Sequence, residues 1–385
     1  MKPAAATDWI LPDRLFDGET LRGGVALGLA EGKVIALSAV GALPDGALPT
    51  RISGIVTPGY VDLQVNGGGD VLLNNAPETA SLTAIARAHR RLGTVAILPT
   101  VITDAPAVLE RAVDAVLGAR DRPEILGLHI EGPHISLRRR GTHAPEHIRP
   151  FDDLTLAQVA RLCDAGVAVM VTLAPEAVKP GDVARLVARG AIVSIGHTDA
   201  TAAEVRALLD EGASAFTHLY NAMSQMQGRA PGTVGAAINS TAHVGIICDG
   251  HHVADEMIGL ALRARPLPDR MFLVSDAMST VGGSDRFMLY GHEIRVEDGR
   301  LVNAEGALAG AHVTMAESVA RLITVLGLPP QEALRMAVTV PAGLIDRSTL
   351  ARIMDRPARD LLVLGPDWMP QGTLADNLSE SGPAA

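Results

Sequence analysis

The sequence has few aromatic residues, few cysteines and no excess of positive charge. Aromatic side chains make up 3% of its 385 residues, which argues against the stacking platforms that bind single-stranded nucleic acid. The formal net charge is −10, whereas a broad surface for a phosphate backbone requires positive charge. We therefore expect no nucleic-acid partner, and an anionic substrate would need a local cluster of basic groups.

Cysteines and long apolar runs are scarce as well. The two cysteines, Cys163 and Cys248, fit a reducing compartment and argue against a disulfide framework. Cys163 falls in a helical pattern and Cys248 precedes "DGHH", and both are interpreted as small core residues. The first residues lack the apolar core of a signal peptide, and no apolar run reaches membrane-spanning length. These absences favour a cytoplasmic protein that does not associate with a membrane.

From Gly54 onward, short apolar runs alternate with amphipathic stretches. The runs are "YVDLQVN", "TVAILPTVIT", "ILGLHIEGP", "VAVMVTLAPE", "AIVSIGHTD", "ASAFTHLYNA", "HVGIICDGHH" and "RMFLVSDAM". Most are followed by a helical pattern such as "LTAIARAHRRLG" or "TAAEVRALLDEG". This rhythm predicts an α/β protein with a (β/α)8 TIM barrel. An open doubly wound sheet is the alternative, but it usually places a glycine-rich turn and a helix after its first strand, and "NGGGD" opens no obvious helix.

Five segments depart from the regular alternation. In the sixth unit "SQMQGRAPGTVGAAINS" predicts a loop where a helix is due, and "VGGSDRFMLYGHEIRVEDGRLVNAEGALAG" predicts a hairpin insertion after the eighth strand. The first fifty residues predict short strands and turns, and "RDLLVLGPDW" predicts a strand that pairs with them. The final "NLSESGPAA" is predicted to be disordered.

The carboxyl ends of the predicted strands hold most of the polar residues of interest, and in an α/β barrel these ends carry the chemistry. In strand order they are Gln64, Asn66, Glu131, His197, His218, His252 and Asp276. Glu131, His197 and His218 suit zinc or a similar divalent ion, with one position left open for water. Asp276 is placed to accept a proton from that water. Singly, these residues also have structural interpretations as turn residues, helix caps or a core histidine, but their joint placement favours the functional one.

Motifs between Thr57 and Met278 carry a resemblance to a known family. They are "TPGYVDLQVNGGGD", "LGLHIEGPHIS", "RRGTHAPEHIR", "SIGHTDA", "THLYNAM" with "GRAPG", "DGHHV" and "LVSDAM". With them the chain resembles the amidohydrolase superfamily and, within it, the N-acetylglucosamine-6-phosphate deacetylase family; "THLYNAM" followed by "GRAPG" separates that family from dihydroorotases and ureases. We therefore expect a barrel of residues 57–344 beside a small β-sandwich domain formed by residues 1–56 and 345–385.

The resemblance also implies roles for individual residues. Glu131, His197 and His218 would bind one divalent ion per subunit, Zn²⁺ in first place and Fe²⁺, Mn²⁺ or Co²⁺ as alternatives, and Asp276 would be the catalytic acid/base. The substrate-binding residues would be Thr142, His143, Asn221, Ala222, Arg229, Asp249, Gly250, His251, His252, Leu308, Ala309 and Gly310. In "DGHHV", His252 matches the family histidine and His251 the variable position before it. His143 is also a catalytic candidate that stabilises the oxyanion, and Arg229 offers a planar fork for a phosphate.

The expected reaction is hydrolysis of N-acetyl-D-glucosamine 6-phosphate to D-glucosamine 6-phosphate and acetate, in amino-sugar catabolism, by a cytoplasmic homodimer. One alternative is an amidohydrolase that acts on a related N-acetylhexosamine phosphate or on an N-acyl amino acid. Another is a catalytically silent scaffold, although a scaffold has no need to keep the Glu, His, His and Asp set. A sugar-phosphate isomerase or aldolase barrel commonly uses a Lys or Glu base, and no Lys is evident at the strand ends.

The end of the first strand and a run of arginines are two further features of the sequence. The first strand ends in Gln64 and Asn66, where many amidohydrolases carry a His-x-His pair. Because neutral amides are poor zinc ligands beside imidazole, we expect them at most to form hydrogen bonds near the metal site, with the alternative that they only end the strand. The run Arg138–Arg140 is interpreted as a solvated group of charges, with a mobile active-site loop as the alternative.

Overall fold

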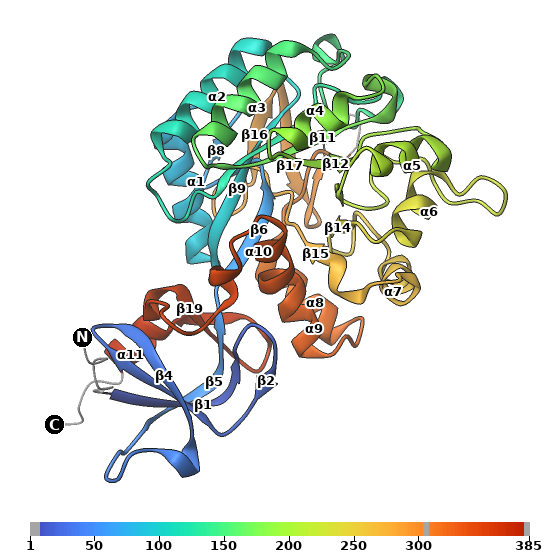
Figure 1. Cartoon of the computed structure of the whole chain (residues 1–385). Coiled ribbons are helices and arrows are strands. Elements are labelled where there is room, and N and C mark those ends of the chain that lie inside the picture. The colour runs from blue at the N-terminus through green and yellow to red at the C-terminus, as the bar shows by residue number, and fades with distance from the viewer. Residues whose placement is uncertain (1–7, 303–307, 381–385) are drawn as a thin grey trace.

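The computed structural model describes residues 8–302 and 308–380, and its centre is a parallel barrel (Figure 1). Within these residues the barrel strands are β6 (Tyr60–Val65), β9 (Thr94–Ile102), β10 (Gly127–Glu131), β11 (Ala168–Leu173), β12 (Ile192–Ile195), β13 (Ala215–Phe216), β14 (His243–Ile246) and β15 (Met271–Leu273). They form one eight-stranded sheet in sequence order. A parallel bridge between Val65 and Ala277 joins the first strand to the segment after the last. The predicted (β/α)8 fold is confirmed.

Helices surround the barrel. They are α1 (Thr79–Arg91), α2 (Pro106–Gly118), α3 (Asp153–Asp164), α4 (Asp182–Ala188), α5 (Ala202–Asp210), α6 (Gly232–Asn239), α7 (Asp255–Ala264) and α8 (Met315–Thr324). Helix α1 buries Leu82, Ile85, Ala86 and His89, a helical spacing that turns one apolar face to the sheet. Helix α5 begins at a capping box in which Thr201 and Glu204 bond each other's backbone N–H groups.

Helix α6 corrects the prediction of a loop in the sixth unit. Residues 224–231 do form a loop, but a helix follows from Gly232, and all of its residues except Asn239 are buried. A Cβ at Gly235 would lie 2.7 Å from the Cβ of Pro231, so the glycine that weakens helix propensity also permits close packing. Burial outweighs propensity here.

Between the barrel and α8, the chain forms a short antiparallel sheet of β16 (Arg286–Leu289), β17 (His292–Glu297) and β18 (Arg300–Val302). The predicted hairpin insertion is thereby confirmed with an additional strand, although its residues 303–307 lie outside the described part of the chain. A smaller ribbon of β7 (Gly67–Gly68) and β8 (Val71–Leu72) follows the first barrel strand.

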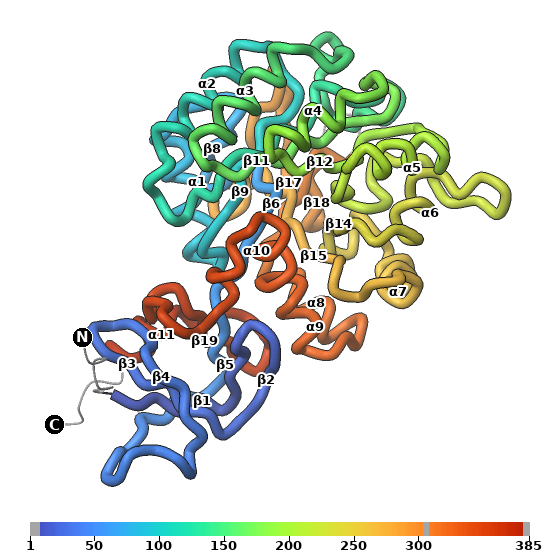
Figure 2. Tube along the Cα trace, viewed as in Figure 1, coloured from blue at the N-terminus to red at the C-terminus, as the bar shows by residue number. Residues whose placement is uncertain are grey.

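A separate domain is built from both ends of the chain (Figure 2). Its sheet contains β1 (Asp8–Phe16), β2 (Leu21–Arg22), β3 (Val25–Ala30), β4 (Lys33–Ala39), β5 (Thr50–Pro58), β19 (Leu361–Leu364) and β20 (Pro370–Thr373). Strand β19 pairs antiparallel with β5, which confirms the predicted pairing of the two chain ends. The domain boundaries at residues 56 and 345 stay predictions, and β5 runs through the first of them.

Two helices connect the barrel to this domain, and one ends the described chain. Helix α9 (Pro330–Leu334) continues through a π-helical turn at Arg335–Thr339 into α10 (Val340–Leu344). Helix α11 (Leu374–Glu380) corrects the prediction of disorder for 377–380, while residues 381–385 lie outside the description. Its Leu374 is buried in the core of the small domain, and this contact orders the helix. Among the described residues, none of the helices has the length and hydrophobicity that a membrane crossing requires.

Candidate active site

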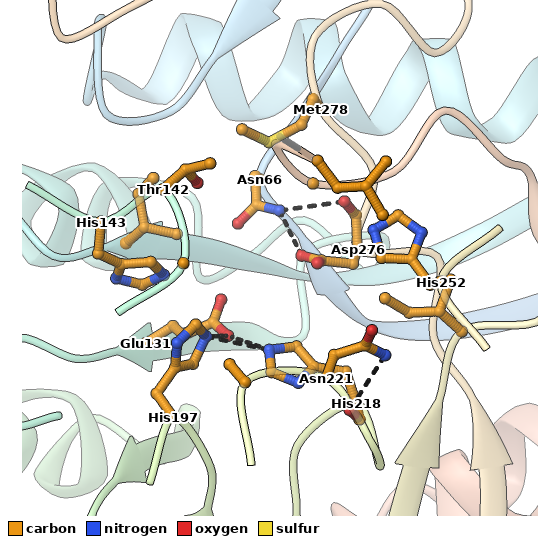
Figure 3. Close-up of a pocket in the computed structure, with 16 residues that line it drawn as sticks. Asn66, Glu131, Thr142, His143, His197, His218, Asn221, His252, Asp276 and Met278 are labelled. Carbon is orange, nitrogen blue, oxygen red and sulfur yellow. Dashed lines mark hydrogen bonds and ion pairs between the residues drawn. The ribbon is translucent and has the colours of Figure 1, made fainter. Parts of the chain in front are cut away.

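A cavity of about 180 Å³ opens at the carboxyl ends of the barrel strands (Figure 3). The predicted site residues that line it are Asn66, Glu131, Thr142, His143, His197, His218, Asn221, Ala222, His252, Asp276, Leu308 and Gly310. The predicted residues that do not line it are Gln64, Arg229, Asp249, Gly250, His251 and Ala309. Met278 and Ile102 line the cavity but were not singled out from the sequence, although Met278 ends the quoted motif "LVSDAM".

The three expected metal ligands converge on one point. Glu131 Oε1 lies 3.2 Å from His197 Nε2 and 3.0 Å from His218 Nε2, and the two Nε2 atoms are 3.1 Å apart. All three side chains are buried. Four ligands placed tetrahedrally about 2.0 Å from a zinc ion are about 3.3 Å from one another, so the spacing and the donor set fit a divalent ion.

A hydrogen bond fixes which nitrogen of His197 faces this point. His197 Nδ1 lies 2.8 Å from the carbonyl oxygen of Arg139. A carbonyl oxygen only accepts hydrogen bonds, so Nδ1 carries the proton and the lone pair of Nε2 is available to bind a metal ion. Burial lowers the pKa of His218, but the hydrogen bond and the negative charge of Glu131 outweigh burial and raise that pKa overall.

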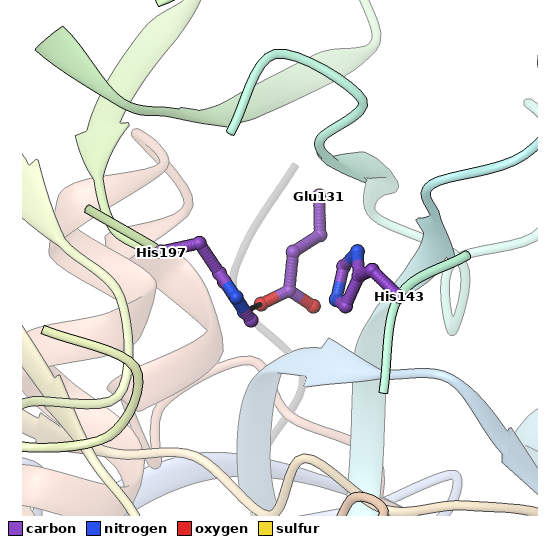
Figure 4. A group of neighbouring side chains, drawn as sticks. All are labelled: Glu131, His143 and His197. Carbon is purple, nitrogen blue, oxygen red and sulfur yellow. Dashed lines mark hydrogen bonds and ion pairs between the residues drawn. The ribbon is translucent and has the colours of Figure 1, made fainter. Parts of the chain in front are cut away.

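A second set of potential ligands overlaps the first. One ligand atom each of Glu131, His143 and His197 lies within 4.8 Å of the others (Figure 4). Figure 4 shows the two imidazoles on opposite sides of the carboxylate. However, His143 Nδ1 is 2.7 Å from Thr103 Oγ1, and Glu131 and His197 both contact His218 more closely. Burial, followed by the charge of His197, lowers the pKa of His143 to about 3, so this imidazole is neutral.

Asp276 lies across the cavity from the three ligands (Figure 3). Its Oδ1 accepts hydrogen bonds from Asn66 Nδ2 at 2.7 Å and from Gln64 Nε2 at 3.1 Å. The same Gln64 nitrogen lies 3.1 Å from both carboxylate oxygens of Glu131. Burial and then the negative charge of Glu131 raise the pKa of Asp276 to about 6. The two amides therefore hold the two carboxylates of the site in fixed positions.

Three of the candidate site residues have a backbone in the left-handed region, which few residues other than glycine adopt. The φ angle is +47° at His197, +30° at His218 and +51° at Asp276. Such a conformation costs of order 1–3 kcal/mol and persists only where the surroundings enforce it. At each strand end it turns the chain so that the side chain faces the cavity.

The remaining predicted residues have distinct places. Asp249 Oδ2 lies 2.6 Å from His252 Nδ1, so this carboxylate orients His252, whose ring lines the cavity. Burial raises the pKa of Asp249, but its hydrogen bonds with His252 outweigh burial and lower that pKa to about 2. His251 is exposed, and Arg229 is exposed on the loop before α6. Of the described residues that line the cavity, none is an arginine or a lysine.

A buried polar layer lies below the site and was not anticipated. His129 bonds Thr100 Oγ1 at 3.3 Å and Thr172 Oγ1 at 2.7 Å, and Thr172 Oγ1 lies 2.6 Å from Thr217 Oγ1, itself 2.6 Å from Ser194 Oγ. Since side chains two apart on a strand share a face, His129 lies on the same face of β10 as Glu131. The two-residue spacing of His129 and Glu131 was the signal in the sequence that could have placed His129 on this face.

Fold and site together are those of an amidohydrolase. No model of a known protein family matches the chain, but individual proteins do. The chain is 41% identical to N-acetylgalactosamine-6-phosphate deacetylase of Shewanella sp. (strain ANA-3) over 82% of this chain and 80% of that protein. It is 32% identical to N-acetylglucosamine-6-phosphate deacetylase of Haemophilus influenzae over 87% of this chain and 90% of that protein.

Solved structures agree with these relatives. N-acetylglucosamine-6-phosphate deacetylase from Pasteurella multocida superposes with a TM-score of 0.87 at 32% identity, covering 95% of this chain and 97% of that one. A mutant of the Mycobacterium smegmatis enzyme in complex with N-acetyl-D-glucosamine 6-phosphate gives 0.84 at 30% identity, covering 94% and 96%. The chain belongs to the family of N-acetylglucosamine- and N-acetylgalactosamine-6-phosphate deacetylases. The resemblance inferred from the motifs is confirmed, as is the class of enzyme, an amide hydrolase.

Proposed function

We propose that the protein hydrolyses the acetamide of N-acetyl-D-glucosamine 6-phosphate to D-glucosamine 6-phosphate and acetate, in amino-sugar catabolism. The observation that supports this most is the convergence of Glu131, His197 and His218 opposite Asp276 in one cavity. A second candidate substrate is N-acetylgalactosamine 6-phosphate, because a relative named for that epimer is 41% identical, compared with 32% for the relative named for the glucosamine compound.

In this proposal Glu131, His197 and His218 hold one divalent ion, Zn²⁺ in first place, with Fe²⁺, Mn²⁺ or Co²⁺ as alternatives. Bound there, the ion would polarise the acetamide carbonyl and lower the pKa of a water molecule. The Gln64 and Asn66 amides donate hydrogen bonds to carboxylates, so they add no second set of ligands. Elemental analysis of extensively dialysed active protein should give one equivalent of metal per chain, and two equivalents would refute the single-ion proposal.

Asp276 moves the proton. Both amides donate to its Oδ1, so Oδ2 is the oxygen that accepts a proton from the attacking water and passes it to the departing amine nitrogen. With its pKa raised to about 6, the carboxylate is ionised at neutral pH, but it is a stronger base than an exposed aspartate.

His143 assists at the carbonyl oxygen. Thr103 can donate its hydroxyl proton to His143 Nδ1, at 2.7 Å, which leaves Nε2 as the protonated nitrogen that faces the cavity. A neutral imidazole in that tautomer donates a hydrogen bond to the oxyanion as negative charge develops. The hydrogen bond with Thr103 favours His143 as a donor to the oxyanion over its alternative role as a metal ligand.

The sugar phosphate would contact Thr142, Asn221, Ala222, His252, Leu308 and Gly310, which line the cavity. Asp249 acts through His252, while Gly250, His251 and Ala309 shape the same segments. Because Arg229 is exposed on its loop, it would reach the phosphate from that loop of its own chain or of a second subunit. The proposal includes the expected homodimer, and it places the protein in the cytoplasm.

The deciding experiment is acetate release from a panel of substrates. The panel contains N-acetylglucosamine and N-acetylgalactosamine, each with and without the 6-phosphate, and an N-acetyl amino acid. We expect turnover of the two 6-phosphates, with the larger kcat/KM identifying the epimer. Turnover of the N-acetyl amino acid alone would contradict the proposal.

A further inference from the structure

Two of the three consecutive arginines before His143 form ion pairs with an aspartate on the loop after β12. Arg139 Nε lies 2.8 Å from Asp199 Oδ1, and Arg138 Nη1 lies 3.1 Å from Asp199 Oδ2. Both arginines belong to a short 3₁₀ turn, Leu137–Arg139. Arg138 and Arg139 remain at least partly solvated, as interpreted from the sequence, but both have a specific partner.

The same loop also contacts the ligand His197 directly. The Arg139 carbonyl accepts the hydrogen bond from His197 Nδ1 at 2.8 Å, and Ser136 N donates to the His197 carbonyl at 2.8 Å. Asp199 is only two residues beyond His197. One carboxylate therefore joins the loop that carries Thr142 and His143 to the turn that carries a metal ligand.

The turn at His197 is held from its other side as well. Glu176, in the 3₁₀ turn after β11, accepts hydrogen bonds from Asp199 N and from Thr198 Oγ1, both at 2.6 Å. These bonds keep the Asp199 backbone in place whatever happens to its side chain. Since His197 has a left-handed backbone, support on both sides of this turn is needed to keep it there.

We propose that Asp199 is a positioning residue, whose carboxylate holds the 136–143 loop against the His197 turn. The proposal rests on the proposed function, in which His197 is a metal ligand and His143 and Thr142 contact the substrate. The Arg139 carbonyl sets the tautomer and direction of His197, and the ion pair sets the position of that carbonyl. Outer partners of ligating histidines typically change metal affinity or activity by roughly 10- to 100-fold.

The exposure of the three side chains separates this role from a contribution to stability. The side chains of Arg138, Arg139 and Asp199 are 83%, 37% and 25% exposed. Ion pairs of this exposure contribute little to the free energy of unfolding. Loss of Asp199 should therefore act on the site and leave stability nearly unchanged.

The experiment compares Asp199→Ala, Arg139→Ala and Asp199→Asn with wild type. Zn²⁺ affinity is measured by competition with a chelator in the absence of substrate, together with kcat, KM and thermal unfolding. Because Arg139→Ala keeps the backbone carbonyl of residue 139, any loss of Zn²⁺ affinity reflects a shift in the position of that carbonyl and not the loss of an acceptor. We expect roughly 10- to 100-fold weaker Zn²⁺ binding in both alanine variants. The loss should be smaller in Asp199→Asn, which keeps one acceptor oxygen. In the double variant with both Asp199→Ala and Arg139→Ala, the losses of Zn²⁺ affinity should not add.

The control is Asp114→Ala, which removes an exposed ion pair with Arg161 (2.6 Å) on the outer helices. It should leave Zn²⁺ affinity unchanged. Unaltered Zn²⁺ affinity in Asp199→Ala, or an equal loss in Asp114→Ala, overturns the proposal while wild-type acetate release upholds the proposed function. If wild type binds no divalent ion, both are wrong.

Discussion

The two ends of the barrel differ in which residues occupy the left-handed backbone positions. At the amino ends of the strands glycine fills them, for example Gly93 before β9 (φ +95°) and Gly190 before β12 (φ +94°). At the carboxyl ends His197, His218 and Asp276 adopt positive φ angles in spite of their side chains. Glycine has no Cβ to strain, so the amino ends are built at low conformational cost, while the carboxyl ends keep strained residues where their chemistry is used.

An arginine–aspartate group occurs at both ends but has different neighbours. At the amino end Asp360 lies between Arg90 (2.8 Å) and Arg356 (3.4 Å) and joins α1 to the segment that leads into β19. At the carboxyl end Asp199 joins two active-site loops. A cavity of about 520 Å³ at the amino end and one of about 590 Å³ beside the active-site loops are both larger than the active-site cavity of about 180 Å³. Convergent polar groups on a strained backbone therefore identify the site, and cavity size does not.

The largest expected effect comes from replacing Asp276, the proposed proton carrier at the carboxyl end. In Asp276→Asn, kcat should fall by roughly 10²–10⁴-fold, since the amide cannot accept a proton. Metal content, measured by elemental analysis, should stay near that of wild type. A variant that retains wild-type kcat would show that Asp276 is not the acid/base.

The next effect concerns the loop that follows β13. Arg229→Ala should lower kcat/KM for the 6-phosphate by about 10- to 150-fold, because a charge-assisted bidentate contact contributes on the order of 1.5–3 kcal/mol. The unphosphorylated sugar serves as the control and should be hardly affected. Equal losses on both substrates would point to a structural defect of the loop.

Much of this architecture was predictable because each barrel strand is a short apolar run followed by a helical pattern. The meeting of the candidate site residues was predictable because parallel strands bring their carboxyl ends to one rim, so that Glu131, His197 and Asp276 line one cavity although they are far apart in sequence. Helix α6 was missed because its glycines and the preceding Pro231 predict a loop until burial is known. Helix α11 was missed because its only deep anchor is Leu374.

Pairings between loops could not be predicted from local patterns. Nothing near Arg139 indicates Asp199 as its partner, and Thr103 becomes a neighbour of His143 only in the folded barrel. Asp249 was expected to contact the substrate, yet it bonds the side chain three residues onward. Residue type and strand position predict which residues lie at the rim, whereas their partners depend on loop conformations that the sequence pattern does not specify.

At the amino end we expect an effect on stability without an effect on chemistry. Asp360→Ala should reduce the free energy of unfolding by about 1–3 kcal/mol, because the side chain is 14% exposed and its loss leaves Arg90 and Arg356 without their shared carboxylate. Urea unfolding measures this change, and kcat/KM should stay near wild type. The exposed Asp285→Ala is the matched control, with little change in either quantity. A large fall in kcat with no loss of stability would remove the contrast between the two ends.

The smallest effect tests the backbone contrast itself, with two opposite substitutions. Gly190→Ala introduces a Cβ at φ +94° with nothing within 4 Å of it, so only backbone strain changes, and the free energy of unfolding should fall by about 1 kcal/mol. Ala222→Gly relieves strain at φ +50° and should raise the free energy of unfolding by a similar amount. The greater conformational entropy that glycine gives the unfolded chain reduces this gain. Since Ala222 lines the cavity and Gly190 does not, kcat/KM should decrease in Ala222→Gly and stay near wild type in Gly190→Ala. Destabilisation of similar size by both substitutions would show that Ala222 is not strained and that the left-handed positions at the two ends are equivalent.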